Sequence, residues 1–310
     1  MNKVYLYTAV AVVLSSAAFA DEVPSVSGVI SLSANLGNLV DNDLFSIDSS
    51  GFDANADIQL QVTKNFSVDF VLAHGEDNFD VDEDITLETT RWGIEPKYVF
   101  DNNAFSGLYY QDFRFGAEGE TLSLNSVGVF GGYDAKNYSV ELYAGQTTAD
   151  EFFANVDATN LGISGSFMAS DDLELYGHYS VGDVGNWEGP SGINTLVGAG
   201  FDYKASTSIS VYGAVTLFDI MESNDSITQV ALGMGADLGA MGVDLPGMLT
   251  ADWTHTDYGI DDVTGDTFAI GWTFSFGGSE ARSQNCVVNN ARGENRAPFS
   301  AAFECVGVLF

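Results

Sequence analysis

The chain is poor in positive charge and in histidine. Of its 310 residues, ten are Lys or Arg, 44 are Asp or Glu, and three are His. A protein that binds nucleic acid needs basic side chains to neutralise phosphates, so this balance argues against a nucleic-acid partner and against a cleft for anionic substrates. The same balance favours cations among the small partners of the protein.

Long apolar runs are also missing. The stretch Val4–Ala17 is shorter than the roughly 20 residues that a membrane-spanning helix needs. It follows Lys3 and precedes Ala18-Phe19-Ala20, which predicts that residues 1–20 are a secretory signal peptide cleaved after Ala20. An uncleaved membrane anchor is the alternative. Because no other run is long enough, the exported chain is expected to enter a membrane only as a closed barrel, in which every backbone group is satisfied.

Cysteine is scarce, and the two that occur, Cys286 and Cys305, both lie in the last 34 residues. In an oxidising compartment we predict one disulfide between them that closes a short loop, with two free thiols as the alternative. The sequence contains no spacing typical of a catalytic triad, a zinc site or a phosphate loop. We therefore predict that the protein is not an enzyme and has no metal and no cofactor.

The most informative pattern that is present is Thr264–Phe276, TGDTFAIGWTFSF. Large apolar residues occupy every second position, with small or polar residues between them: Phe268, Ile270, Trp272, Phe274 and Phe276. A β-strand points successive side chains to opposite faces, so one face of this segment is apolar and the other is polar. In a membrane barrel the apolar face meets lipid and the polar face lines water.

The same alternation recurs in fourteen segments of about ten residues between residues 25 and 276. Short turns alternate with longer acidic loops such as Gly37–Asn55 and Gly75–Asp84, which is the layout of an outer-membrane barrel with periplasmic turns and external loops. The predicted fold class is therefore all-β, an antiparallel transmembrane β-barrel of about fourteen strands over residues 21–276. Twelve and sixteen strands are the alternatives.

Residues 277–310 differ from the barrel in composition. They carry as many bases as acids, namely Arg282, Arg292 and Arg296 against Glu280, Glu294 and Glu304. We predict that this segment is a C-terminal periplasmic extension. A plug inside the barrel and a partly ordered tail are the alternatives.

Assigning the more apolar face of each segment to lipid places the other face in the lumen. This predicts twelve charged pore-lining side chains: Asp57, Asp69, Arg91, Glu95, Lys97, Asp112, Arg114, Glu141, Glu174, Asp202, Lys204 and Asp252. Asp112 and Arg114 are placed inward because an arginine facing lipid would cost about 2–4 kcal/mol at mid-bilayer. Rings of acidic side chains favour cations in a pore. The alternative is that these are solvated wall residues without a selective role.

On this pattern the chain resembles the Gram-negative outer-membrane porins over residues 21–276. The strand that ends on Phe276 is similar to the closing strand of porins, although 34 residues follow it. The resemblance implies an outer-membrane location among lipid and lipopolysaccharide. It also implies passive diffusion of small hydrophilic solutes, with a bias toward cations from the acidic lumen, and it allows a homo-oligomer.

Other functions stay open. One is a structural or adhesive barrel that works through its acidic loops. Another is an outer-membrane hydrolase, because His178-Tyr179-Ser180 resembles the nucleophile pair of outer-membrane phospholipases, although His178 and Ser180 are predicted to face away from lipid. The segment Glu76–Asp84 is acidic enough to hold a divalent cation, but it lacks the glycine and the distal glutamate of a calcium loop, which favours a solvated loop.

Overall fold

The structure is a computed structural model of the chain. It describes residues 24–41, 45–80, 85–117, 120–150, 156–185, 192–219, 226–243, 245–259 and 263–306. The predicted signal peptide and its cleavage site after Ala20 lie outside the described residues and stay a prediction.

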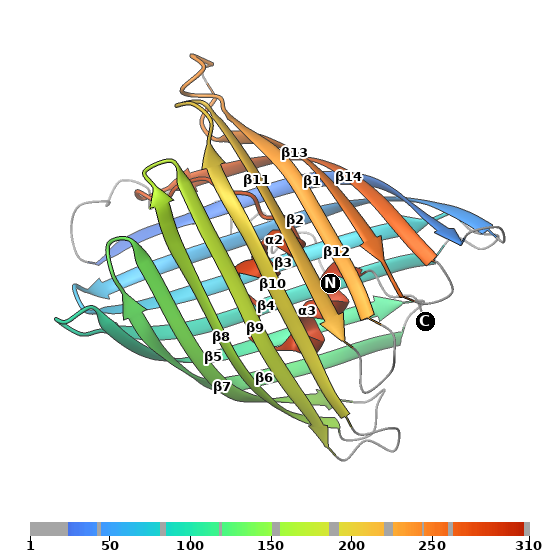
Figure 1. The fold of residues 1–310 in the computed structure, drawn as a ribbon, viewed down its shortest axis with the longest axis horizontal. Helices are drawn as coiled ribbons and strands as arrows, with labels where there is room; N and C mark the ends of the chain where they lie inside the picture. Colours follow the sequence, from blue (N-terminus) through green and yellow to red (C-terminus); the bar gives the residue numbers. More distant parts are fainter. Residues whose placement is uncertain are drawn as a thin grey trace.

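Fourteen antiparallel strands form one closed barrel, in which each strand pairs with its neighbours in sequence and β1 pairs with β14 (Figure 1). The predicted fold class and strand number are confirmed. The strands are β1 (Ser25–Asp41), β2 (Phe45–Thr63), β3 (Phe66–Phe79), β4 (Ile85–Val99), β5 (Ala104–Ala117), β6 (Glu120–Asp134), β7 (Tyr138–Asp150), β8 (Val156–Ser170), β9 (Leu173–Gly185), β10 (Gly192–Lys204), β11 (Ile209–Asp219), β12 (Ser226–Asp237), β13 (Met248–Asp257) and β14 (Val263–Phe276).

Side-chain alternation gives the barrel an apolar outer face. In β14, Phe268 and Ile270 are 63% and 65% exposed, whereas Thr273 on the opposite face is 1% exposed. Leu36 of the adjacent strand β1 is 67% exposed and lies opposite Phe268 in the β1–β14 register. Such a belt of exposed large apolar residues has the character of a lipid-facing surface.

The predicted loops are shorter than expected, because the strands are longer. The segment Gly37–Asn55 is mostly a strand hairpin, since β1 and β2 pair from Ser25 with Gln61 to Asp41 with Phe45. The predicted loop Gly75–Asp84 likewise begins with five residues of β3. In these segments Asn, Asp, Ser and Gly interrupt the apolar residues on both faces, with Leu39 buried inside and Phe52 exposed outside, so the alternation that identifies a strand is lost.

The C-terminal segment turns back into the barrel directly after β14. Gly277 and Gly278 have φ of 65° and 89°, and a Cβ on Gly277 would collide with the backbone of β1 at Val26. The left-handed conformation and this close approach both require glycine. We call residues 277–306, the described part of the segment, the plug.

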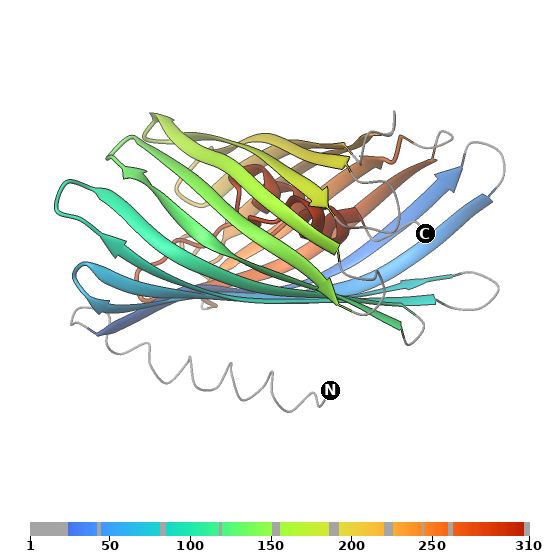
Figure 2. The same ribbon diagram turned by 90° about the horizontal axis from the view of Figure 1, so that it is seen from below.

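Two short helices of the plug lie inside the barrel, α2 (Cys286–Arg292) and α3 (Pro298–Val306). Both views show them enclosed by the strands, and α2 contacts β8 to β12 (Figures 1 and 2). The predicted periplasmic extension is therefore wrong for the described part of this segment, which occupies the lumen. A charge-balanced segment is stable there because its basic residues meet an acidic wall.

Helix α2 is defined by its caps and by complete burial of one side. The Asn285 side chain accepts hydrogen bonds from the backbone of Val287 and Val288, and Gly293 ends the helix in the left-handed conformation. Val287, Val288 and Ala291 are fully buried. They pack against wall residues of β9, β11 and β12, namely Tyr176, Tyr212, Ala214 and Ala231.

Two further apolar clusters lie on the inner wall near the strand ends opposite the short turns. One combines residues of β1, β10, β11, β12 and β14 with Ala301 of α3, and the other joins Phe113, Leu122 and Leu124 to small residues of β7 to β9. In the described part of the chain no helix has the length and apolar character needed to cross a membrane. The interior of the barrel is thus a packed core in places and a charged interface in others.

We predict that a side chain at Gly198 displaces α2. A Cβ there would lie 2.6 Å from Cα of Ala291, closer than real contacts allow. Gly198→Val should expose the plug, and labelling of Cys286 and Cys305, the only cysteines of the chain, with a maleimide under reducing conditions would report this. The matched control is Gly177→Val on the outer face of β9, whose Cβ would meet nothing closer than 3.4 Å. Equal labelling of the two variants would contradict the packing described here.

Candidate functional site: the lumen and its plug

The inner wall holds most of the charged residues that the alternation predicts. Ten of the twelve predicted side chains face the lumen: Asp57, Asp69, Arg91, Glu95, Lys97, Glu141, Glu174, Asp202, Lys204 and Asp252. Their positions follow from strand parity, because apolar neighbours one residue away face outward. The structure places these residues on the lumen face; their role in selectivity stays a prediction.

Asp112 and Arg114 face outward, contrary to the prediction. Asp112 is paired in register with the outward Trp92, whose ring contacts Tyr110 on the same face, and Arg114 donates to Asp112 at 2.9 Å. Tyr109 and Phe113, which alternate with them, are buried inside. The pair lies toward the loop end of β5, where an arginine costs about 0–1 kcal/mol, so the mid-bilayer penalty that motivated the inward placement does not apply.

The charged centre of the lumen is Arg296 of the plug. Its guanidinium Nε donates to Glu141 at 2.9 Å, and its Nη1 donates to Glu95. The guanidinium also lies over the rings of Phe130 and Tyr109, 4.5 and 5.5 Å from their centroids. Burial alone would lower the pKa of Arg296, but Glu95 and Glu141 raise it overall, so the arginine stays charged.

A second plug arginine, Arg292 at the end of α2, has a similar arrangement against other strands of the wall. Arg292 pairs with Asp202 of β10 and lies 4.9 Å from the ring centroid of Tyr176 in β9. Its side chain is 10% exposed. Burial opposes the charge of this guanidinium, whereas Asp202 raises its pKa.

Two further ion pairs between wall and plug differ in burial. Arg91 of β4 donates to Glu304 of α3 at 3.0 Å, and both side chains are largely buried. Lys204 and Glu280 pair at 3.1 Å but are 55% and 80% exposed. The wall acids and bases thus meet plug residues of opposite sign, which the sequence alone did not reveal.

Arg282 contacts one carboxylate of the wall and one of the plug. It lies 2.9 Å from Glu294 and 3.8 Å from Asp57 of β2, with its side chain 42% exposed. Its position between a wall carboxylate and a plug carboxylate makes it a bridge at the more open side of the interface.

His178 serves the plug interface as well. Its Nε2 lies 2.9 Å from the Tyr143 hydroxyl, and its Nδ1 lies 3.0 Å from the carbonyl oxygen of Asn290 in α2. His178 and Ser180 are buried on the lumen face at 4% and 0% exposure. Both ring nitrogens of the histidine are therefore engaged inside the barrel, away from the surface where a lipid substrate would lie.

Cys286 begins α2 and Cys305 lies near the end of α3. Both are free thiols in the structure, within hydrogen-bonding reach of each other and against the same apolar cluster. Burial raises the pKa of the Cys305 thiol, which also accepts from the Asn290 amide at 3.0 Å. The disulfide stays a prediction, and the packing of the two helices brings its partners together.

Two lumen acids escaped the sequence analysis. Asp53 of β2 accepts hydrogen bonds from Ser33 and Asn35, and Asp77 of β3 lies beside it across Gly51 and Gly75. Both lie in segments that were interpreted as loops or loop ends, so their facing was not considered. The predicted acidic stretch Glu76–Asp84 is split: residues 81–84 lie outside the described residues. No group of three or more His, Cys, Asp or Glu placed for a metal ion occurs in the described ranges.

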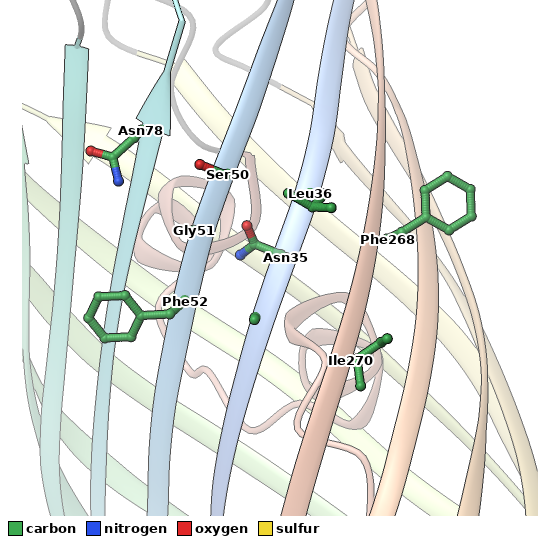
Figure 3. Close-up of a pocket in the computed structure, with 9 residues that line it drawn as sticks. Asn35, Leu36, Ser50, Gly51, Phe52, Asn78, Phe268 and Ile270 are labelled. Atoms are coloured by element: carbon green, nitrogen blue, oxygen red, sulfur yellow. The ribbon is translucent and has the colours of Figure 1, made fainter.

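A hollow on the outer wall lies apart from this interface. It is formed where β1, β2 and β14 expose apolar side chains, with Leu36, Phe52, Phe268 and Ile270 around it (Figure 3). All four are more than 40% exposed. We assign it to the lipid-contact surface rather than to the functional site.

Comparison with known proteins rests on the fold. No protein-family model and no curated protein matches the sequence. Among solved structures, a loop-deletion mutant of OmpT, an outer membrane protein of Vibrio cholerae, aligns with a TM-score of 0.52 and 12% identity over 82% of this chain and 100% of that chain. The chain has the fold of an outer-membrane β-barrel protein.

Two other barrels support the same conclusion. A Pseudomonas aeruginosa FadL homologue aligns with a TM-score of 0.53 and 10% identity over 84% of this chain and 92% of its own. An anion-selective porin from Comamonas acidovorans aligns with a TM-score of 0.52 and 10% identity over 81% and 99%. At these identities the likeness concerns the fold and leaves the function of the barrel to its own residues.

We predict that Arg296→Met loosens the plug much more than Lys204→Met. Removing Arg296 leaves two buried carboxylates without a partner, which should cost about 2–5 kcal/mol. The exposed Lys204–Glu280 pair should contribute at most about 1 kcal/mol. Maleimide labelling rates of Cys286 and Cys305 in folded protein measure plug opening in both variants. Similar rates would show that the buried cluster does not hold the plug.

Proposed function

We propose that the protein is a channel in the outer membrane of a Gram-negative bacterium. It passes small hydrophilic solutes by passive diffusion with a bias toward cations, and the described state is the closed form, with the plug in the lumen. The observation that carries the proposal is the pairing of wall acids with plug arginines at Arg296 and Arg292. These bonds hold a separate segment reversibly in a charged interior that would otherwise line water.

The proposed cation bias follows from the excess of acidic side chains on the inner wall. Besides seven predicted acids that face inward, Asp53 and Asp77 also lie on the lumen face, whereas the inward bases of the prediction are Arg91, Lys97 and Lys204. Acidic rings concentrate cations and repel anions. The Comamonas porin is described as anion-selective; a wall with this excess of acids supports the opposite preference.

The lumen gives little support to a catalytic role. His178 is the best placed candidate for a catalytic residue of a hydrolase. Both of its ring nitrogens are already in hydrogen-bonding contact, one with the Tyr143 hydroxyl and one with the backbone of α2. We therefore propose that the barrel is not an enzyme. Lipid and lipopolysaccharide as surroundings, and a homo-oligomer, are part of the same proposal.

The filled lumen favours one second candidate. A barrel whose interior is occupied by buried residues such as Val287 and Val288 could serve as a structural element with its loops as the working surface. The two candidates differ in one respect, because only a channel conducts once the plug is out.

We predict that removal of the plug opens the channel. In planar bilayers the mature full-length protein should rest mostly closed, and a chain that stops after Phe276 should conduct steadily with a cation-favouring reversal potential in a salt gradient. Heat-modifiable migration on gels would show that the shortened barrel is folded. A folded, silent barrel without the plug would overturn the channel and favour the structural candidate.

We also predict that lumen charge sets ion selectivity. Asp69→Lys combined with Glu174→Lys should shift the reversal potential of the opened channel toward anions, because both side chains lie on the lumen face. Asp112→Lys makes a like change of charge on the outer face and should leave the potential unchanged. A shift of equal size in both cases would mean that selectivity does not arise at the inner wall.

A further inference from the structure

We propose that the inner wall carries two binding sites for guanidinium groups, which the plug arginines occupy in the closed barrel. Their natural ligands are small solutes that bear a guanidinium. As a statement about transport this inference rests on the proposed function, and it names the substrate class. As a statement about binding it depends only on the wall residues themselves.

The first site has the chemistry that a planar cation needs. Glu95 and Glu141 accept from two different nitrogens of the Arg296 guanidinium, on its edge, while Phe130 and Tyr109 lie against its faces. Carboxylates at the edge and aromatic rings on the face are the two interactions that distinguish a guanidinium from a compact ammonium or a metal ion. The arginine is 7% exposed, so the site excludes most water.

The four groups of this site come from four neighbouring strands. Glu95 lies on β4, Tyr109 on β5, Phe130 on β6 and Glu141 on β7. Because each is fixed in the barrel ladder and none belongs to the plug, the site persists when the plug leaves. Wall glycines make the room for its rings, since a Cβ at Gly107 would collide with the Phe130 ring.

The second site is simpler and lies on β9 and β10. Asp202 accepts from Arg292, and the Tyr176 ring lies under the guanidinium at 4.9 Å. A carboxylate is combined with an aromatic ring at both sites. One such site could arise by chance, but two indicate that the wall is suited to guanidinium groups. The exposed pair of Lys204 with Glu280 has no aromatic partner among the ring contacts found in the structure.

The plug then acts as an internal competitor. It presents the same chemical group as the solute, and its short connection to β14 holds that group at an effective concentration of about millimolar or more. A guanidinium-bearing solute at comparable concentration displaces the plug arginines and so favours the open barrel. An inorganic cation lacks the planar shape that the rings contact and competes less well.

Chemical rescue of Arg296→Ala in the full-length chain tests the binding sites. The variant should label faster with maleimide at Cys286 and Cys305. Guanidinium chloride should restore protection at concentrations that fill the vacated Arg296 site but are too low to displace Arg292 from the second site. Sodium chloride should need a roughly tenfold higher concentration for the same effect, given the contribution of a desolvated cation–π contact. Adding Glu95→Gln and Glu141→Gln should abolish the rescue.

Two controls keep this experiment decisive. Arg282→Ala removes a plug arginine that is 42% exposed and pairs only with carboxylates in the described contacts, so guanidinium should not restore it. If Arg296→Ala does not fold, Arg292→Ala provides the same test at the second site. Equal rescue by both salts, or none in a folded variant, would overturn the inference.

Conductance separates this inference from the proposed function. Agmatine added to the wild-type full-length protein in a bilayer should raise the open fraction, whereas sodium at equal ionic strength should not. Specific rescue without any conductance, even after the plug is deleted, would leave the guanidinium sites standing and reject the channel. Conductance after plug deletion, with no rescue and no response to agmatine, would reject the sites alone.

Discussion

A buried arginine between two carboxylates determines how the interior of this barrel is organised. Arg296 brings one charge from the C-terminal segment to a place where Glu95 and Glu141 bring two from the wall. None of the three is stable there alone, because an unpaired buried charge is costly. The wall carboxylates therefore need the plug arginine or water as a partner, and the plug arginine needs the wall carboxylates. The apolar contacts of Val287, Val288 and Ala291 hold α2 against the wall alongside these ion pairs.

The barrel could be predicted because alternation is local. Each strand shows its lipid face in its own sequence, as Phe268 and Ile270 do in β14, and fourteen such segments imply closure. The same rule failed at two places, where side chains of one character no longer occupy one face of the strand. Between Gly37 and Asn55 polar residues interrupt the apolar ones on both faces of the β1–β2 hairpin, and this part was interpreted as a loop. At the rim of the belt a charge costs little, so Asp112 and Arg114 could face outward against expectation.

The plug was only an alternative in the sequence analysis, because its partners are far away in sequence. Arg296 pairs with Glu95 across 201 residues, and no local pattern connects them. Two weak signals were present. Gly277 and Gly278 directly follow the last strand, where a reversal requires positive φ. Three arginines also occur in the tail of a chain that has only ten bases, so the tail is the one concentrated source of positive charge for an acidic interior.

The Gly277–Gly278 reversal ties the plug to the wall that it closes. Only residues 279–285 separate this turn from α2, a reach of about 3.3–3.6 Å per residue when extended. A plug that leaves its sites therefore stays at the mouth of its own barrel. Reclosing is a first-order event within one molecule, independent of how many barrels the membrane holds. Under the proposed gating, each barrel carries its own blocking segment on a short connection, so reclosing needs no second molecule.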